Sequence, residues 1–330
     1  MLKVYCLNRN MAKSLFRSHI RRSITKICIN TTYYRGYDPI ADNFFNQGTL
    51  QSKCMVLQTT LFAALAQLGV LSSHPETQSE VFEHILDDAA LASSFYVNIA
   101  LAGFTIIAIL LLVRNVTDPR AKMIAFVTLM ISAVSISSYT GLASGLTVGF
   151  LEMPAGHAFA GEQVLTMWGR YLTWGLSTPF ILIALGLLAR SNWTKIGIAV
   201  SMTIGMCVTG LAAALTTSSH ALRWFWFAIS SAFFVVIIYI ILAEWAREAE
   251  EAGTEDIFTK LKILTVVTWF GYPVLWFAGA EGVGLLEVWM TSWAYSVLDI
   301  VAKYLVTILI ILYVAEEPDE VCGGEDYGRV

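Results

Sequence analysis

The chain has 330 residues, of which 56% are hydrophobic and only 14% are charged, and its formal net charge is −4. Its mean hydropathy is +0.64. A water-soluble domain of this length does not carry so much apolar surface, so the composition excludes that class and indicates a polytopic membrane protein. The chain also lacks a glycine-rich phosphate loop, which argues against a machine that hydrolyses ATP by itself.

The N-terminal part differs in composition from the rest. Residues 1–53 contain nine Lys and Arg against two Asp, whereas residues 54–330 contain twelve basic against twenty-three acidic residues, a net charge of −11. The lack of acids before Asp38 fits a transit peptide, and it equally fits sequence upstream of the true start codon, which we favour. The apolar stretch from Met55 resembles a signal segment or an interfacial helix. We expect residues 1–83 to be a poorly ordered extension that adds no chemistry.

Seven apolar stretches of about 20 residues follow, each long enough to cross a bilayer. They lie near residues 90–113, 122–148, 166–189, 196–216, 222–245, 261–279 and 290–314. The connections are short and show no repeat, which favours antiparallel neighbours in one bundle. The predicted fold is therefore an all-α membrane protein, with a seven-helix domain over residues 84–315 and an acidic tail over residues 316–330.

Basic residues predict the orientation of these spans, because loops that stay in the cytoplasm are enriched in Lys and Arg. The first, third and fifth loops are flanked by Arg114, Arg120, Lys122, Arg190, Lys195, Arg247, Lys260 and Lys262. The opposite loops offer almost nothing but Arg223. We expect the odd loops and the C-terminus to be cytoplasmic and the start of the first span to be extracellular.

One charged residue lies near the middle of the seventh span. Placing Lys303 there costs at least about 3 kcal/mol on insertion scales, so its ammonium group should face the bundle interior and have a partner. Asp299 precedes it by four residues, one helical turn, and therefore shares its face. Position alone leaves two interpretations, a structural ion pair or a lysine that carries a cofactor.

The third span has a polar stripe at helical spacing. Arg170, Thr173, Trp174 and Ser177 follow an i, i+3, i+4, i+7 pattern and offer hydrogen-bond donors from one face. Such a row suits a desolvated anion, although hydroxyls are also common at contacts between membrane helices. Arg170 favours the anion, since a buried guanidinium must be neutralised and Asp299 is the only acid near the centre of a span.

Aromatic residues gather on two other spans. Trp269, Tyr272, Pro273 and Trp276 share a face of the sixth span, and the fifth span adds Trp226, Phe227 and Ser230. Such stripes are more often ordinary packing. Here they converge with Trp174 on a bundle that holds a buried lysine, which suits a long conjugated ligand held between rings.

The sequence gives no sign of a metal site. Its five cysteines, at positions 6, 28, 54, 207 and 322, form no CxxC motif, and its five histidines are scattered. Glu152 and His157, in the loop after the second span, are interpreted as structural cap residues rather than a gate.

The strings LDIVAKY, RYLTW and TWFGYP resemble the microbial rhodopsins. SYTGLASGLT, LEMPAGH and CVTGLAAALTTSSH resemble the halorhodopsin branch of that family, and the match covers roughly residues 84–315. The resemblance implies a multi-pass protein of the cell membrane, a light-driven inward chloride pump and not an enzyme, with all-trans retinal bound to Lys303 as a protonated Schiff base.

The resemblance also implies roles for individual residues. Asp299 is the expected counterion, and Arg170, Thr173, Trp174 and Ser177 are expected around the halide. The expected retinal pocket consists of Trp174, Thr178, Met206, Gly210, Trp226, Ser230, Trp269, Tyr272, Pro273 and Trp276. Thr265 and Lys262 match the family's cytoplasmic exit path. The family often forms trimers, whereas no nucleic-acid partner is expected.

Charge counting agrees with the halorhodopsin branch. In the proton-pumping relatives an aspartate matches Thr173 and a proton-donating acid matches Ala184, and both are missing here. A protonated Schiff base on Lys303, with Arg170 and Asp299, leaves the site at +1 in a low-dielectric interior. One halide neutralises it, and light is expected to turn the Schiff-base N–H so that the anion follows past Lys303.

Two alternatives remain open from the sequence. A sensory photoreceptor of the same fold could use the same chromophore and signal through a transducer. A receptor or small-solute transporter could instead use Lys303 and Asp299 as a structural pair, in which case added retinal produces no visible absorption band.

Overall fold

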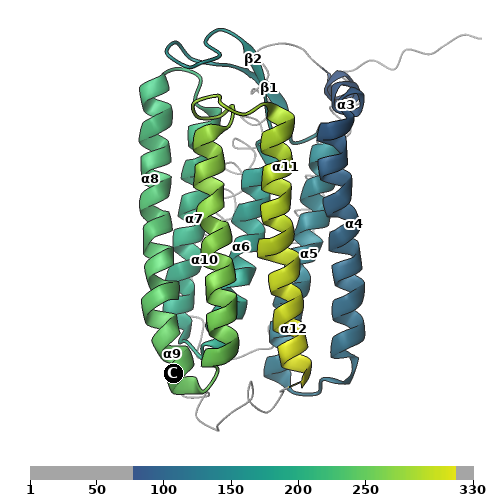
Figure 1. Cartoon of the computed structure of the whole chain (residues 1–330), viewed down its shortest axis with the longest axis vertical. Coiled ribbons are helices and arrows are strands. Elements are labelled where there is room, and N and C mark those ends of the chain that lie inside the picture. The colour runs from purple at the N-terminus through teal and green to yellow at the C-terminus, as the bar shows by residue number, and fades with distance from the viewer. Residues whose placement is uncertain (1–76, 317–330) are drawn as a thin grey trace, which may run out of the picture. The chain divides into compact units, whose positions relative to one another are not determined.

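The computed structural model describes residues 77–316, which form a bundle with seven helical spans (Figure 1). This confirms the predicted all-α class. The first four spans are α4 (Ala89–Leu112, continued by the 3₁₀ turn η1, Val113–Asn115), α5 (Pro119–Ala143), α6 (Gly169–Leu188) and α7 (Trp193–Leu215). The fifth joins α8 (His220–Tyr239), the π-helical η2 (Ile240–Glu244) and α9 (Trp245–Ala252), and the sixth is α10 (Glu255–Ala278). The seventh joins α11 (Val288–Asp299), the π-helical η3 (Ile300–Leu305) and α12 (Val306–Glu316).

The spans differ in how far they are buried. In the most apolar window of α6, 61% of the residues are buried, against 22% in α4. Helix α6 packs on α5, α7 and also α10, so it is a central helix, whereas most of the α4 window is not buried. Polar residues that point inward from α6 therefore meet several helices at once.

The fifth span is longer than its apolar stretch predicts. Apolar residues end at Trp245, but the helix continues as α9 to Ala252 and stops where Gly253 adopts a left-handed conformation with φ +76°. The extension is charged, and ion pairs connect it to the start of α7. Lys195 Nζ on α7 lies 2.7 Å from Glu244 Oε2 and 2.6 Å from Glu248 Oε1. We call this end of the bundle the α9 end.

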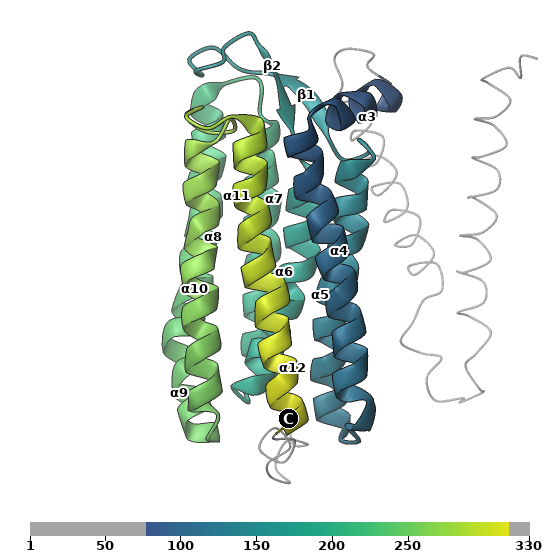
Figure 2. The ribbon, with the colours of Figure 1, turned by 45° about the vertical axis from the view of Figure 1, so that its right-hand side comes forward.

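The opposite end carries two elements that hydrophobic periodicity did not predict. Strands β1 (Gly149–Glu152) and β2 (Gln163–Thr166) pair antiparallel, with Gly149 opposite Thr166. Helix α3 (Gln78–Asp87) precedes α4, so the described chain begins inside the range assigned to the N-terminal extension. Residues 1–76 and the tail from residue 317, on which the other predictions about the termini fall, lie outside the described residues. We call this end the hairpin end (Figure 2).

Helix α5 stops five residues earlier than predicted because the chain turns there. Gly145 has φ +69°, and a Cβ at this position would lie 3.1 Å from the backbone nitrogen of Phe82 and 3.3 Å from the carbonyl oxygen of Gln78. Only glycine adopts this conformation without strain and leaves room for α3. The turn thus brings α3 onto the hairpin end.

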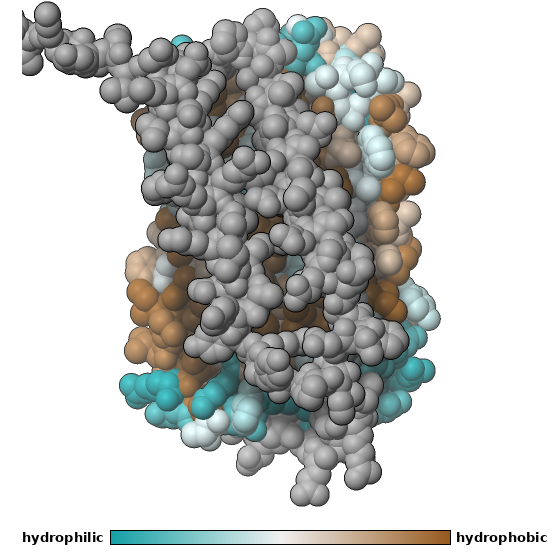
Figure 3. Space-filling model, turned by 180° about the vertical axis from the view of Figure 1, so that it is seen from behind, coloured by the Kyte–Doolittle hydropathy of each residue, from teal (hydrophilic) through white to brown (hydrophobic). Residues whose placement is uncertain are grey.

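The surface matches a bilayer environment. Large apolar side chains such as Phe104, Val208 and Val267 are at least 60% exposed at positions along the spans. Where the spans are visible in Figure 3, apolar residues cover their middle, and hydrophilic residues gather at the lower end of the view.

Candidate cofactor and anion site

Lys303 and Asp299 form a buried ion pair. Lys303 Nζ lies 2.9 Å from Asp299 Oδ2, and the two side chains are only 2% and 1% exposed. The predicted pairing along one helical face is therefore present in the structure. A pair this deeply buried needs further hydrogen bonds to offset its desolvation.

Three other side chains supply these hydrogen bonds to Asp299. Tyr139 donates to Oδ2 at 2.7 Å, and Tyr272 donates to Oδ1 at 2.6 Å. The indole N–H of Trp174 lies 3.3 Å from Oδ1. The carboxylate thus accepts hydrogen bonds from side chains on α5, α6 and α10 and from Lys303, and these bonds stabilise its charged form. Sequence reasoning missed Tyr139, although SYTGLASGLT contains it.

The helix around Lys303 is not a regular α-helix. Residues Ile300–Leu305 form the π-helical segment η3, and the N–H of Val306 bonds to the carbonyl of Val301, five residues back. Short π segments often lie at functional sites, because they leave backbone groups without their usual partners. The widened turn therefore lies at Lys303, the one buried lysine among residues 77–316.

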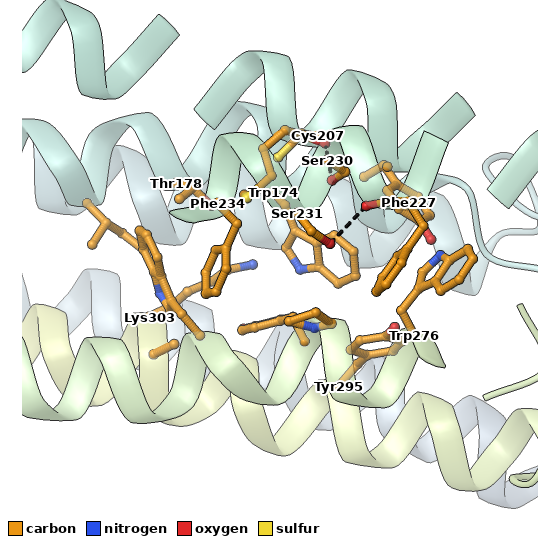
Figure 4. Close-up of a pocket in the computed structure, with 18 residues that line it drawn as sticks. Trp174, Thr178, Cys207, Phe227, Ser230, Ser231, Phe234, Trp276, Tyr295 and Lys303 are labelled. Carbon is orange, nitrogen blue, oxygen red and sulfur yellow. Dashed lines mark hydrogen bonds between the residues drawn. The ribbon is translucent and has the colours of Figure 1, made fainter. Parts of the chain in front are cut away.

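A cavity extends from Lys303 between α6, α7, α8 and α10 (Figure 4). It holds about 780 Å³ of space free of protein atoms, counting the part that is open to the outside. Aromatic rings form much of its wall: Phe227 and Trp276 stack with centroids 4.4 Å apart, and Trp174 meets Tyr272 edge to face at 5.2 Å. In Figure 4 Lys303 lies toward one end of the cavity and Trp276 toward the other.

Most residues predicted for the pocket line this cavity. They are Trp174, Thr178, Met206, Gly210, Ser230, Trp269, Tyr272, Pro273 and Trp276, together with Lys303. The lining also includes residues that the sequence did not single out: Tyr171, Ile181, Cys207, Ser231, Phe234, Tyr295 and Ala302.

Trp226 is a correction to the predicted pocket, because it is not among the lining residues described. The face of α8 toward the cavity carries Phe227, Ser230, Ser231 and Phe234, at i, i+3, i+4 and i+7. Trp226 precedes this stripe by one residue, about 100° around the helix. Its ring lies 5.6 Å from that of Phe225 and packs against the cluster that contains Tyr171 and Trp276. Of the two neighbouring aromatic residues named from the sequence, only Phe227 faces the cavity.

Arg170 is 3% exposed and lies on the hairpin side of the ion pair. Its Nη2 donates to Ser292 Oγ at 2.7 Å and its Nη1 to the hydroxyl of Tyr139 at 3.3 Å. Among the residues described, Arg170 makes no ion pair within 4 Å, so Tyr139 alone connects it to Asp299. This guanidinium therefore lacks a carboxylate of its own, and its Nε has no hydrogen-bond partner.

The two predicted hydroxyls are buried one turn apart on α6. Thr173 donates to the carbonyl of Gly169 at 3.0 Å, and Ser177 donates to the carbonyl of Thr173 at 2.6 Å. Each hydroxyl can turn from its own helix toward an anion, because hydroxyl rotors follow the best acceptor available. Of this α6 stripe, Trp174 contacts Asp299 directly and Arg170 reaches it through Tyr139, while Thr173 and Ser177 are buried beside them.

The residues predicted for an exit path lie on α10, nearer the α9 end. Thr265 is fully buried, and its hydroxyl has no hydrogen-bond partner. Lys262, one turn nearer the end of the helix, is partly exposed. Ala184, where the proton pumps have an acid, is fully buried in the apolar core, and Leu185 and Trp245 belong to the same cluster. Whether an anion follows this route stays a prediction.

Two titratable groups at the hairpin end lie outside the spans. Burial raises the pKa of Glu281, while the hydroxyl of Tyr171, 2.9 Å away, opposes that rise. Burial, followed by the positive charge of Arg223 and by His220, lowers the pKa of His157. His157 is 5% exposed and accepts the N–H of Phe159, a position consistent with a cap, whereas Glu152 is exposed.

The residues present fit a covalently attached polyene. Eight of the 18 residues that line the cavity are aromatic, and its one buried amine can form an imine with an aldehyde. The carboxylate of Asp299 lies beside that nitrogen and can neutralise a cationic imine.

Comparison with known proteins agrees with this geometry. Residues 89–317 match the family described as bacteriorhodopsin-like proteins. A halorhodopsin of Halobacterium sp. (strain SG1) is 65% identical over 238 residues, which are 72% of this chain and 84% of that one. A halorhodopsin of Halorubrum sodomense is 62% identical over 247 residues, 75% of this chain and 88% of the relative. The solved structure of a halorhodopsin described as a light-driven chloride pump superposes with a TM-score of 0.71 at 52% identity, covering 72% of this chain and 99% of that chain.

Proposed function

Since the chain belongs to the bacteriorhodopsin-like family, in its halorhodopsin branch, we propose that it is a light-driven pump that carries chloride inward across the cell membrane. Lys303 would hold retinal as a protonated Schiff base, and the bound retinal would supply light absorption and isomerisation. The remaining steps belong to the protein's own side chains.

The observation that carries the proposal is the charge balance around Lys303. Arg170 and Lys303 are cations, and Asp299 is the one carboxylate that hydrogen-bonds within this group. Glu281 lines a smaller cavity together with Arg170 and Trp174. Arg223 Nη2 donates to the backbone carbonyl of Glu281 at 2.7 Å, so the formal charges of Glu281 and Arg223 cancel. The site therefore keeps a net charge of +1, which favours one bound anion in a low-dielectric interior.

The side chains divide the work of binding. Arg170 attracts the anion, and the hydroxyls of Thr173 and Ser177 can donate to it. Tyr139 and Tyr272 hold Asp299 in place beside Lys303, so the carboxylate does not collapse onto Arg170. Because residue 173 is a threonine, it cannot accept a proton from the nitrogen of Lys303, so the proton would stay on that nitrogen while the anion moves.

Ion flux in lipid vesicles tests the direction and the cargo. Purified protein, reconstituted with retinal, should move chloride in the light. A protonophore should leave that flux intact, because in a chloride pump protons only move passively to balance the charge that chloride carries. Flux that a protonophore abolishes would identify a proton pump and reject the proposal. Chloride titration of the visible spectrum should show a saturable shift.

Thr173→Asp tests the charge argument separately. The added carboxylate brings the site to zero, so the chloride concentration at half saturation should rise about tenfold or more, a factor that corresponds to ~1.4 kcal/mol. Thr173→Asn, which adds similar bulk without charge, is the matched control. Equal chloride affinity in all three proteins would contradict the assignment of the anion site.

The homotrimer that the family resemblance implies belongs to the same proposal, with the lipids of the bilayer around it. Light scattering of the detergent-solubilised protein, corrected for bound detergent, measures the mass of the assembly. A monomeric mass at all protein concentrations would contradict the trimer without affecting the pump.

A further inference from the structure

Buried polar residues also gather on the side of Lys303 that faces away from the cavity. The cavity is lined by α6, α7, α8, α10 and the seventh span, and none of its lining residues comes from α4 or α5. On those two helices the buried polar positions form stripes at helical spacing. They are Ser94, Asn98 and Thr105 on α4, and Thr128, Ser132, Ser135 and Tyr139 on α5.

Tyr304, next to Lys303 in the chain, joins these stripes to the seventh span. Its hydroxyl donates to the backbone carbonyl of Asn98 at 3.3 Å and lies beside Ser135. Helices α4 and α5 pack against η3, and α5 also packs against α12. The helices α4, α5 and the seventh span therefore meet near Tyr304, on the side of the seventh span away from the cavity.

Two hydroxyls lie one turn beyond this junction toward the α9 end. Ser132 precedes Ser135 by three residues on α5, which runs toward the hairpin end, and Thr307 follows Tyr304 by three residues on the antiparallel seventh span. Each step of three residues moves roughly 4.5 Å along the axis, so both hydroxyls lie on the α9 side of the junction. We call Asn98, Ser132, Ser135, Tyr304 and Thr307 the polar seam.

The polar seam contains side-chain atoms without partners. Ser132 Oγ, Thr307 Oγ1 and Asn98 Oδ1 have no hydrogen-bond partner in the described structure, and all three residues are 0% exposed. Leaving a buried donor or acceptor unsatisfied is costly, so native proteins place a partner there, usually water. By contrast Thr105 and Thr128 donate to carbonyls of their own helices. Within this group of residues the unpaired atoms thus lie at the junction and one turn past it toward the α9 end. Thr203 on α7 and Thr265 on α10 are further buried hydroxyls without a partner.

We propose that the hydroxyls of Ser132 and Thr307 form a second anion site, which holds water in the dark and receives the halide after it has passed Lys303. Two hydroxyl donors suit an anion, whereas Asn98 Oδ1, an acceptor, suits the accompanying water. The inference rests on the proposed pump. It places the first stop beyond Lys303 between α5 and α12, and not at Thr265 on α10.

The experiment compares Ser132→Ala, Thr307→Val and the double variant in retinal-reconstituted vesicles. The chloride titration of the dark spectrum should stay as in the wild type, because Arg170, Thr173 and Ser177 are untouched. Light-driven chloride flux per bound retinal should fall about tenfold for each lost hydroxyl, the factor for one hydrogen bond to a charged group. Thr209→Val is the matched control, since its hydroxyl donates only within α7.

Conservative swaps keep the test decisive if the double variant fails to fold. Ser132→Thr and Thr307→Ser retain a hydroxyl at each position and should retain flux, whereas Ser132→Ala and Thr307→Val should lose it. Unchanged flux in both alanine and valine variants would overturn the second site, as would a loss of flux confined to Thr265→Val. If the wild type itself shows no protonophore-insensitive flux, the pump proposal fails instead, so the two failures are distinguishable.

Discussion

The two sides of Lys303 differ in chemistry. Toward α6, α8 and α10 the lysine faces a cavity walled by rings, among them Trp174, Trp269 and Trp276. Toward α4 and α5 lie the hydroxyl and amide groups of the polar seam. The aromatic side can hold a rigid ligand by shape, while the polar side can exchange small hydrogen-bonding species. Lys303 therefore lies between the ligand-binding cavity and the polar seam. This position suits a residue that couples light absorption to ion movement.

Removing the lysine should have the largest effect, because both sides depend on it. Lys303→Ala should abolish covalent binding of retinal and leave Asp299 buried without its cation. The visible absorption band after retinal addition, and its resistance to extraction by denaturing solvent, measure this. Lys195→Ala, which removes a partly exposed lysine at the α9 end, is the control. A covalently bound visible pigment in Lys303→Ala would refute the attachment site.

Truncating a ring tests the aromatic side alone. Trp276→Ala removes a buried indole that stacks on Phe227, and it should cost about 3–5 kcal/mol of stability with faster loss of retinal. Thermal bleaching of the pigment measures the loss. Trp193→Ala, at a side chain that is 53% exposed, should change bleaching little. Equal bleaching temperatures for the two variants would show that the rings do not hold the ligand.

Tyr139→Phe tests the connection between the two sides. The hydroxyl donates to Asp299 and accepts from Arg170, so its loss should cost about 1–3 kcal/mol and let the guanidinium approach the carboxylate. Chloride at half saturation of the spectral shift should then rise about tenfold, since Asp299 competes with the halide for Arg170. Tyr96→Phe, at a 48% exposed position, is the control. Unaltered chloride affinity would show that Tyr139 does not keep Arg170 and Asp299 apart.

The smallest effect is expected far from both sides, at the hairpin end. The pKa of His157 lies below its ordinary value, so the folded state favours the neutral ring. The stability that this ring contributes is present above the ordinary histidine pKa and is lost as pH falls through the lowered value. His157→Gln should remove this acid-side loss, which we expect to amount to a few degrees in bleaching temperature. If the bleaching temperatures of wild type and variant changed with pH in the same way, the protonation of His157 would not be coupled to unfolding.

The aromatic side could be predicted from the sequence to a large extent, because its residues repeat at helical spacing within single spans. Trp269, Tyr272, Pro273 and Trp276 mark one face of α10 whatever that face meets. The limit of this reasoning shows at Trp226 and Phe227. Helical spacing alone permitted either ring to line the cavity, and only the orientation of α8 in the bundle places Phe227 there. The polar seam was not predicted, because serine and threonine in a span are common and carry no sign of what they face.

By itself the sequence determined the seven spans, the buried lysine with its carboxylate one turn away, and the neutral residue at position 173. These features depend on composition and on the 3.6-residue period, which are local. The tertiary structure alone decided that Tyr139 bridges Arg170 and Asp299, that Ser292 binds the guanidinium, and that α4 and α5 bring unpaired hydroxyls behind Lys303. Those contacts join residues from 31 to more than 200 positions apart, and the packing of whole helices, not any local pattern, sets their distances.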